Sequence, residues 1–182
     1  MYRAFALYAK QWGVASAQDQ KIGELIDRVY IDFDEHGTIL LDGKDVTSEI
    51  IAPEISRFAS EISTRPEVRE RLVAIQREIG KEGGVVLDGR DIGTVVFPDA
   101  ELKIFLVASP EVRATRRLSE LEGIGEKMSL QKLTQEIADR DRRDSERSIS
   151  PLRKADDAIE LDTTGLTIAQ QVEKVVVLAK GI

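Results

Sequence analysis

The stretch GVVLDGRDIGTVVFPD, residues 84–99, decides the fold class of this chain. Its first part, residues 84–88, is a short, uniformly apolar run that ends in an acid, and Leu102–Val107 is a second apolar run. Both predict buried parallel strands, because a strand covered on both faces lacks polar alternation. Ile159–Asp162 is a third core-strand candidate. Strands alternating with helices predict an α/β domain with a parallel sheet and helices on both faces.

Local signals place the helices of this domain. Residues 1–11 predict a helix, and Ser109-Pro110 opens another with an N-cap and a proline in the first turn. After a break at Gly123–Met128, Leu130–Arg147 predicts a long, highly charged helix. Thr167 and Gln170 have the spacing of a capping box for a final helix.

Residues 29–80 predict an insertion on this domain, which itself comprises residues 1–28 and 81–182. Three β-favouring segments predict a small antiparallel sheet, with a hairpin turn after the first; they are Val29–Asp34, Thr38–Leu41 and Lys44–Val46.

Two helices are expected to complete the insertion. The first spans Ser48–Ile62. Thr64 and Glu67 predict a capping box that opens the second helix, and Gly80 ends it.

Composition limits the function classes. The chain has 182 residues, 42% of them hydrophobic, and no cysteine, which excludes disulfides and cysteine-ligated zinc. No apolar run reaches the roughly 18 residues of a membrane span, and no signal peptide is recognisable, so a cytoplasmic protein is expected. The net charge of −7 argues against a dedicated nucleic-acid binder.

Charged residues crowd the segment Asp88–Asp99, just past the carboxyl end of a predicted strand. Ligands bind at that edge of open α/β sheets. Asp88, Arg90 and Asp91 around a glycine therefore indicate a ligand site, while a turn with a structural Asp–Arg pair remains the alternative.

A second charged group lies on the predicted helix at 140–147. Helical spacing puts Arg140, Asp144 and Arg147 on one face. Arg143 and Arg147 would repel each other unless an anion lies between them. A solvated helix with internal ion pairs is the more common meaning of such a run.

Taken together and in order, these segments resemble the bacterial cytidylate kinases over essentially the whole chain. The segments that carry the resemblance are Met1–Ala4, Leu41–Thr47 with Glu49-Ile50, Asp88–Asp99, Arg140-Asp141, Arg147, Ser150–Leu152 and Ala155–Ala158. The resemblance implies a P-loop nucleoside-monophosphate-kinase-like fold with a lid at about 118–130. It implies phosphoryl transfer from ATP to CMP or dCMP, with Mg²⁺ as cofactor. Neither a nucleic acid nor a membrane is an expected partner.

The resemblance also implies residue roles. Ser60, Arg69 and Asp91 would contact the cytosine edge, and Tyr2 would pack beside the nucleotide. Arg3, Arg90 and Arg147 would hold the monophosphate, and Arg140 and Asp144 would reach the sugar. Asp88 would order Arg90 or the magnesium shell, so that Arg90, Arg147 and Asp88 are the expected catalytic residues. Arg116 and Arg117 would meet the ATP phosphates. His36, the only histidine, has no expected role, and no metal ligand is assigned.

The sequence departs from this family in one motif. The pattern Gly-x-x-x-x-Gly-Lys-Ser/Thr, whose backbone amides and lysine cradle ATP phosphates, is absent, and neither Gly43-Lys44 nor Gly80-Lys81 fits it. We therefore expect that a strand–loop–helix unit of roughly 30 residues or more belongs before Met1. A monomer is expected for a full-length chain, and self-association for a truncated one.

Three other functions stay open. The first is a catalytically inactive CMP-binding protein, which the missing loop favours. The second is a related kinase for UMP or AMP, against which Ser60, Arg69 and Asp91 argue. The third is an RNA-binding module, which the acidic balance and an aromatic content of only 5% disfavour.

Overall fold

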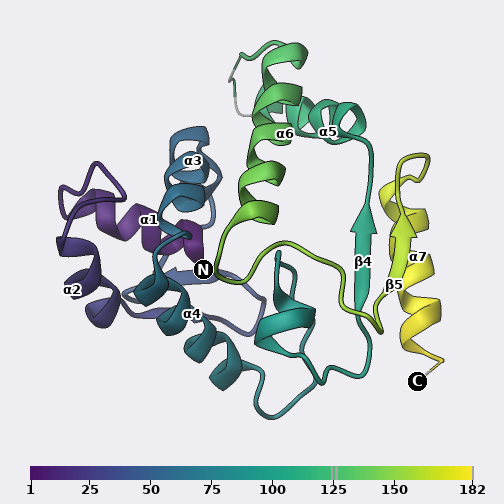
Figure 1. The fold of residues 1–182 in the computed structure, drawn as a ribbon, viewed down its shortest axis with the longest axis horizontal. Helices are drawn as coiled ribbons and strands as arrows, with labels where there is room; N and C mark the ends of the chain where they lie inside the picture. The colour runs from purple at the N-terminus through teal and green to yellow at the C-terminus, as the bar shows by residue number, and fades with distance from the viewer. Residues whose placement is uncertain (124, 126, 182) are drawn as a thin grey trace. The chain divides into compact units, whose positions relative to one another are not determined.

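The computed structural model of the chain describes residues 1–123, 125 and 127–181. By their contacts these residues form two compact units, Met1–Val85 and Val86–Ile182. The fold is mixed α/β, as the sequence predicts (Figure 1). Among the described helices none is long and apolar enough to cross a membrane. The predicted division at residues 28 and 80 stays a prediction.

The first unit holds four α-helices around one apolar core. They are α1 (Tyr2–Gln11), α2 (Lys21–Arg28), α3 (Pro53–Ile62) and α4 (Pro66–Ile79). Helix α1 packs on α3, and α2 packs on α4. Phe5, Ile22, Ile62 and Leu72 are fully buried in the shared core.

A three-stranded antiparallel sheet completes the first unit. Its strands are β1 (Ile31–Phe33), β2 (Ile39–Leu41) and β3 (Lys44–Asp45), in that order. The turn between β1 and β2 is closed by Asp34, whose Oδ1 accepts hydrogen bonds from the backbone N–H groups of Thr38 at 2.8 Å and His36 at 2.9 Å. The predicted hairpin is thereby confirmed.

Two prolines change the helix boundaries that the sequence predicts. The helix expected over Ser48–Ile62 is instead a short 3₁₀ helix, Glu49–Ile51, followed by α3. Ala52 between them is extended, as residues before proline prefer. The prediction of a capping box at Thr64 is wrong for the same reason. Pro66 takes the first helical position, so Arg65 becomes the N-cap of α4. The Thr64 hydroxyl donates to the Glu61 carbonyl instead.

The second unit contains a parallel pair of strands and three α-helices. A π-helical turn, Ile92–Val96, precedes β4 (Ile104–Val107), α5 (Pro110–Gly123), α6 (Leu130–Glu146), β5 (Ile159–Asp162) and α7 (Ile168–Ala179). β4 and β5 pair in parallel, with Ile104 opposite Ile159. Helices α5 and α6 pack together (Figure 1). Ser109 caps α5, and Thr167 with Gln170 forms the predicted capping box of α7.

The extent and burial of the parallel sheet differ from the prediction. Residues 84–88 form no strand, and Val86 is 99% exposed. Two consecutive glycines, Gly83 and Gly84, have positive φ and turn the backbone there. Strands β4 and β5 form as expected but are not buried, since Leu106 is 58% exposed. Among the described residues, only β5 pairs with β4.

Candidate functional site

A buried arginine beside an aromatic ring marks the first unit. Arg69 on α4 is 3% exposed, and its guanidinium lies 5.5 Å from the centre of the Tyr2 ring on α1. Its Nη1 donates to the Ser63 carbonyl at 3.1 Å. Because burying a charged group is costly without partners, these contacts fix the side chain in one place.

Two serines at the end of α3 extend this cluster. Ser63 Oγ donates to the Ser60 carbonyl at 2.8 Å, and Ser60 is 7% exposed. The structure thus brings together Tyr2, Ser60 and Arg69, three of the predicted site residues. Arg3 is half-buried next to Tyr2 on α1. Ser63 was not among the predicted residues, because it contacts Arg69 through its backbone carbonyl, which leaves no side-chain signal in the sequence.

One buried carboxylate organises the predicted site residues of the second unit. Asp144 on α6 is 5% exposed and forms ion pairs with three arginines. Its Oδ2 lies 3.2 Å from Arg90 Nε and 3.8 Å from Arg140 Nε, and its Oδ1 lies 3.6 Å from Arg147 Nη1. The carboxylate of Asp144 thus gathers three guanidinium groups in one place. This arrangement suits a bound anion, because guanidinium forks match phosphate oxygens.

The segment after Arg147 is fastened to the same cluster. Arg147 Nε donates to the Ser150 carbonyl, and the N–H of Leu152 donates to the Asp144 carbonyl at 2.7 Å. The side chain of Arg147 is only 7% exposed. The end of α6 therefore holds its charged residues in a defined geometry.

Two acids of the Asp88–Asp99 segment, Asp88 and Asp91, have different surroundings. Asp91 is 6% exposed and begins the π-helical turn, where its carbonyl accepts from the Val95 N–H at 2.9 Å. Asp88 is exposed and forms no ion pair with a described residue. Gly89 allows the close turn between them, because a Cβ there would lie 2.8 Å from Ile92 Cγ1.

A further ion pair in the second unit has no counterpart in the sequence analysis. Arg113 on α5 lies 2.6 Å from Asp141 on α6, measured from Nη2 to Oδ2. Asp141 Oδ1 in turn lies 4.0 Å from Arg90 Nη2. No spacing rule links residues on separate helices, so this pair could not be predicted.

The arginines expected near ATP both have protein partners. Arg116 Nη2 donates to the Thr163 carbonyl at 2.6 Å, and Arg117 Nη1 lies 2.8 Å from Glu120 Oε2. Arg116 thus holds the segment that follows β5 against α5.

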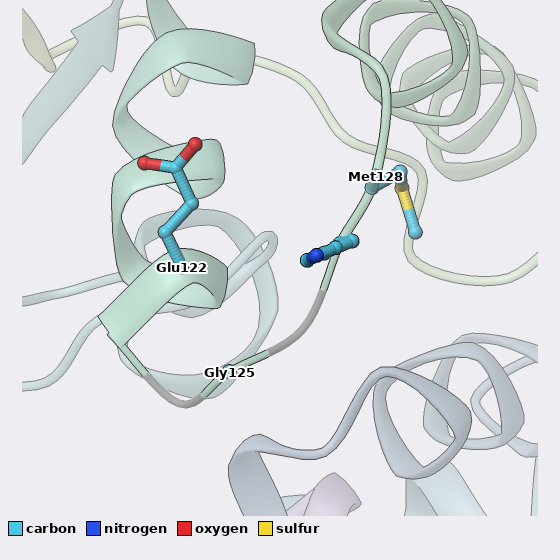
Figure 2. Close-up of a pocket in the computed structure, with 4 residues that line it drawn as sticks. Glu122, Gly125 and Met128 are labelled. Atoms are coloured by element: carbon cyan, nitrogen blue, oxygen red, sulfur yellow. The ribbon is translucent and has the colours of Figure 1, made fainter.

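The expected lid at 118–130 contains the end of α5 and the turn before α6. A pocket of 320 Å³ lies at this turn and is lined by Glu122, Gly125, Lys127 and Met128. Figure 2 shows Glu122 on the last turn of α5 and Met128 on the segment that leads into α6. Residues 124 and 126 of the predicted lid lie outside the described residues.

Within the described part of the chain, no three carboxylate or histidine side chains are close enough to hold a metal ion.

The first unit thus holds an aromatic ring beside a buried arginine, and the second unit holds an arginine cluster around a carboxylate that suits an anionic ligand. The family described as Cytidylate kinase matches residues 1–181, and the chain belongs to this family.

Similar proteins that are named cytidylate kinases support the same family assignment. The cytidylate kinase of Bacillus pumilus is 48% identical over 178 residues, covering 96% of this chain and 79% of the relative. That of Desulfitobacterium hafniense is 47% identical over 180 residues, covering 98% and 78%. That of Bacillus cereus strain B4264 is 43% identical over 185 residues, covering 100% and 82%. The expectation of a further unit before Met1 stays a prediction.

Proposed function

We propose that this protein binds CMP or dCMP and catalyses transfer of the γ-phosphoryl group of ATP to its phosphate, giving CDP or dCDP. The observation that carries the proposal is the arginine cluster around buried Asp144, in a chain of the cytidylate kinase family. We also propose that β4 and β5 are part of a parallel sheet of the kind found in P-loop kinases.

Arg3, Arg90 and Arg147 are the proposed ligands of the acceptor phosphate. Arginine stays protonated at any physiological pH, so these groups offer permanent positive charge and directional N–H donors. Asp144 fixes Arg90 and Arg147 by its two oxygens. Arg140 and Asp144 are proposed to contact the sugar.

Ser60, Arg69 and Asp91 are the proposed contacts of the cytosine edge. A carboxylate accepts from the exocyclic amine of cytosine, whereas uracil has a carbonyl at that place. The burial of Asp91 at the start of the π-helical turn supports this assignment. Tyr2, which already lies against Arg69, is proposed to pack beside the nucleotide.

The chemistry asked of these residues is positioning and charge neutralisation. The accepting phosphate is already anionic, so no general base is needed for in-line transfer. ATP and Mg²⁺ are implied by the family, and Arg116 and Arg117 are proposed near the ATP phosphates. Asp88, exposed and unpaired among the described residues, is the proposed contact of the magnesium shell.

The test is a comparison of acceptors. Titration with CMP, dCMP, UMP and AMP, together with a CDP-forming assay with ATP, is expected to show preference for CMP and dCMP. Asp91→Asn is expected to reduce the preference for CMP over UMP by about 5- to 150-fold. Asp139→Asn, an exposed carboxylate on α6, is the control and is expected to keep the preference. Equal affinity of the wild-type protein for CMP and UMP would contradict the cytosine assignment.

The second candidate is CMP binding without phosphoryl transfer by this chain alone, and the same assay separates it from the first. Tight CMP binding with no CDP formed would support it. CDP formation at the rate of a typical kinase, roughly 1–100 per second, would exclude it.

A further inference from the structure

Arg113 forms a close ion pair beside the arginine cluster around Asp144. Its Nη2 lies 2.6 Å from Asp141 Oδ2, and its Nε donates to the Ala108 carbonyl at 3.1 Å, just after β4. The Arg113 and Asp141 side chains are 31% and 25% exposed. Arg113 is therefore anchored at the start of α5 with its charge directed at α6.

The other oxygen of Asp141 faces Arg90. Oδ1 lies 4.0 Å from Arg90 Nη2, too far for a hydrogen bond. This oxygen is buried and accepts no hydrogen bond from any described residue. A buried carboxylate oxygen without a donor is unfavourable, so Asp141 attracts any guanidinium that can reach it.

Arg90 is thus placed between two carboxylates. Asp144 Oδ2 contacts its Nε at 3.2 Å, whereas Asp141 stays at 4.0 Å. Nε and Nη2 form one edge of the guanidinium group, and a carboxylate can accept from both at once. If Asp141 moved onto this edge, it would neutralise the charge that Arg90 offers to an anion.

We propose that Arg113 is a positioning residue that neutralises Asp141 and so keeps the Arg90 guanidinium available for the acceptor phosphate. This inference rests on the proposed function, which places the phosphate on Arg90. Arg113 touches no substrate in this scheme, and it acts only through Asp141.

The first test is Arg113→Gln, with affinities for CMP and for cytidine measured by calorimetric titration. With Arg113 gone, Asp141 pairs with Arg90, and CMP affinity is expected to fall by about 3- to 30-fold. Cytidine has no phosphate, so its affinity is expected to stay the same. A purely structural role of Arg113 would weaken both ligands alike. Arg142→Gln is the matched control, because Arg142 lies on α6 in an exposed pair with Asp139.

Rescue is the decisive second test. The double variant Arg113→Gln/Asp141→Asn has no carboxylate left to draw Arg90 away, and is expected to regain most of the lost CMP affinity. Asp141→Asn alone is expected to bind CMP at least as tightly as the wild type, which keeps the inference testable should Arg113→Gln fold poorly. Weaker binding by Asp141→Asn, or absence of rescue, would overturn the inference.

Arg90→Gln separates this inference from the proposed function. If Arg90→Gln leaves CMP affinity unchanged, the assignment of the phosphate to Arg90 is wrong. If Arg90→Gln weakens CMP binding and Arg113→Gln does not, only the role of Arg113 is wrong.

Discussion

At the scale of single residues, the buried carboxylate of Asp144 is the centre of the arginine cluster in the second unit. It is 5% exposed and has Arg90, Arg140 and Arg147 within ion-pair distance. Breaking a buried pair leaves uncompensated charge in a poorly solvated place. Asp144→Asn keeps the shape of the side chain and removes only the charge, so it isolates this effect.

Asp144→Asn is therefore expected to lower the free energy of unfolding by about 3–5 kcal/mol, measured by urea denaturation. Phosphate or CMP should restore part of the loss by supplying the missing negative charge. Asp139→Asn removes an exposed pair and is expected to change stability by less than about 0.5 kcal/mol. Similar losses for the two variants would show that burial of the cluster does not matter.

Sequence spacing accounts for only part of this cluster. Arg140, Asp144 and Arg147 share one helical face, and their ion pairs could be predicted. The partner of Arg90 could not, because it comes from a different part of the chain. The resemblance implies that Asp88 orders either Arg90 or the magnesium shell, whereas the Arg90 pairs seen in the structure involve Asp144 and Asp141. Loop geometry and packing decide such contacts, and they have no local signature.

At the scale of helices, capping signals succeed where the chain is free to use them. Thr167 Oγ1 accepts from the Gln170 N–H at 3.3 Å, and Gln170 Oε1 accepts from the Thr167 N–H at 2.9 Å. Thr64 and Glu67 have the same spacing but form no box, since Pro66 moves the helix start and Arg65 pairs with Glu67. The pattern alone does not distinguish the two sites.

The two threonines supply a matched pair of variants. Thr167→Ala is expected to destabilise α7 by about 1 kcal/mol, seen as faster amide exchange in Ile168–Ala179. Thr64→Ala removes no cap, and its effect on stability is expected to stay within about 0.5 kcal/mol. A larger loss for Thr64→Ala than for Thr167→Ala would contradict this assignment.

An ion pair between Lys103 and Asp157 links the segment before β4 to the loop before β5. Lys103 Nζ, just before β4, lies 2.6 Å from Asp157 Oδ2 and also donates to the Pro98 carbonyl. The hydrogen bond from Lys103 lowers the pKa of the Asp157 carboxyl from its ordinary value. A lowered pKa in the folded state means that the contribution is complete above the unfolded pKa, about 3.9, and is lost as pH falls through the folded value.

Asp157→Asn is accordingly expected to lower the melting temperature at pH 7 but to have a smaller effect at pH 2–3. Melting curves across this pH range check the prediction. Asp156→Asn changes a neighbouring carboxyl that pairs with no described cation and serves as the control. A loss for Asp157→Asn that is the same at every pH would rule out the ion pair as its cause.

At the scale of the whole molecule, the two units differ in the size of their buried cores. The first unit has a continuous core that runs through α1–α4 and the small sheet. In the second unit, the described core between α5 and α6 contains only Ala114, Leu121 and Leu133 as buried members. Apolar side chains of β4, β5 and α7 are exposed instead, including Leu106, Ile159 and Ile168. The apolar runs in the sequence correctly predicted the positions of β4 and β5. The burial of these strands depends on the elements that pack on them, and a single apolar run does not reveal those elements.

Because buried apolar surface supplies most of the stability of a folded unit, the first unit is expected to outlast the second during unfolding. Leu72 and Leu121 allow a matched test, since they are 0% and 1% exposed in the two cores. Leu72→Ala should cost the first unit about 2–5 kcal/mol and move the later of two urea transitions. Leu121→Ala should move only the earlier one, with faster amide exchange confined to Val86–Ile182. A single transition that both variants shift equally would instead mean that the chain unfolds as one cooperative body.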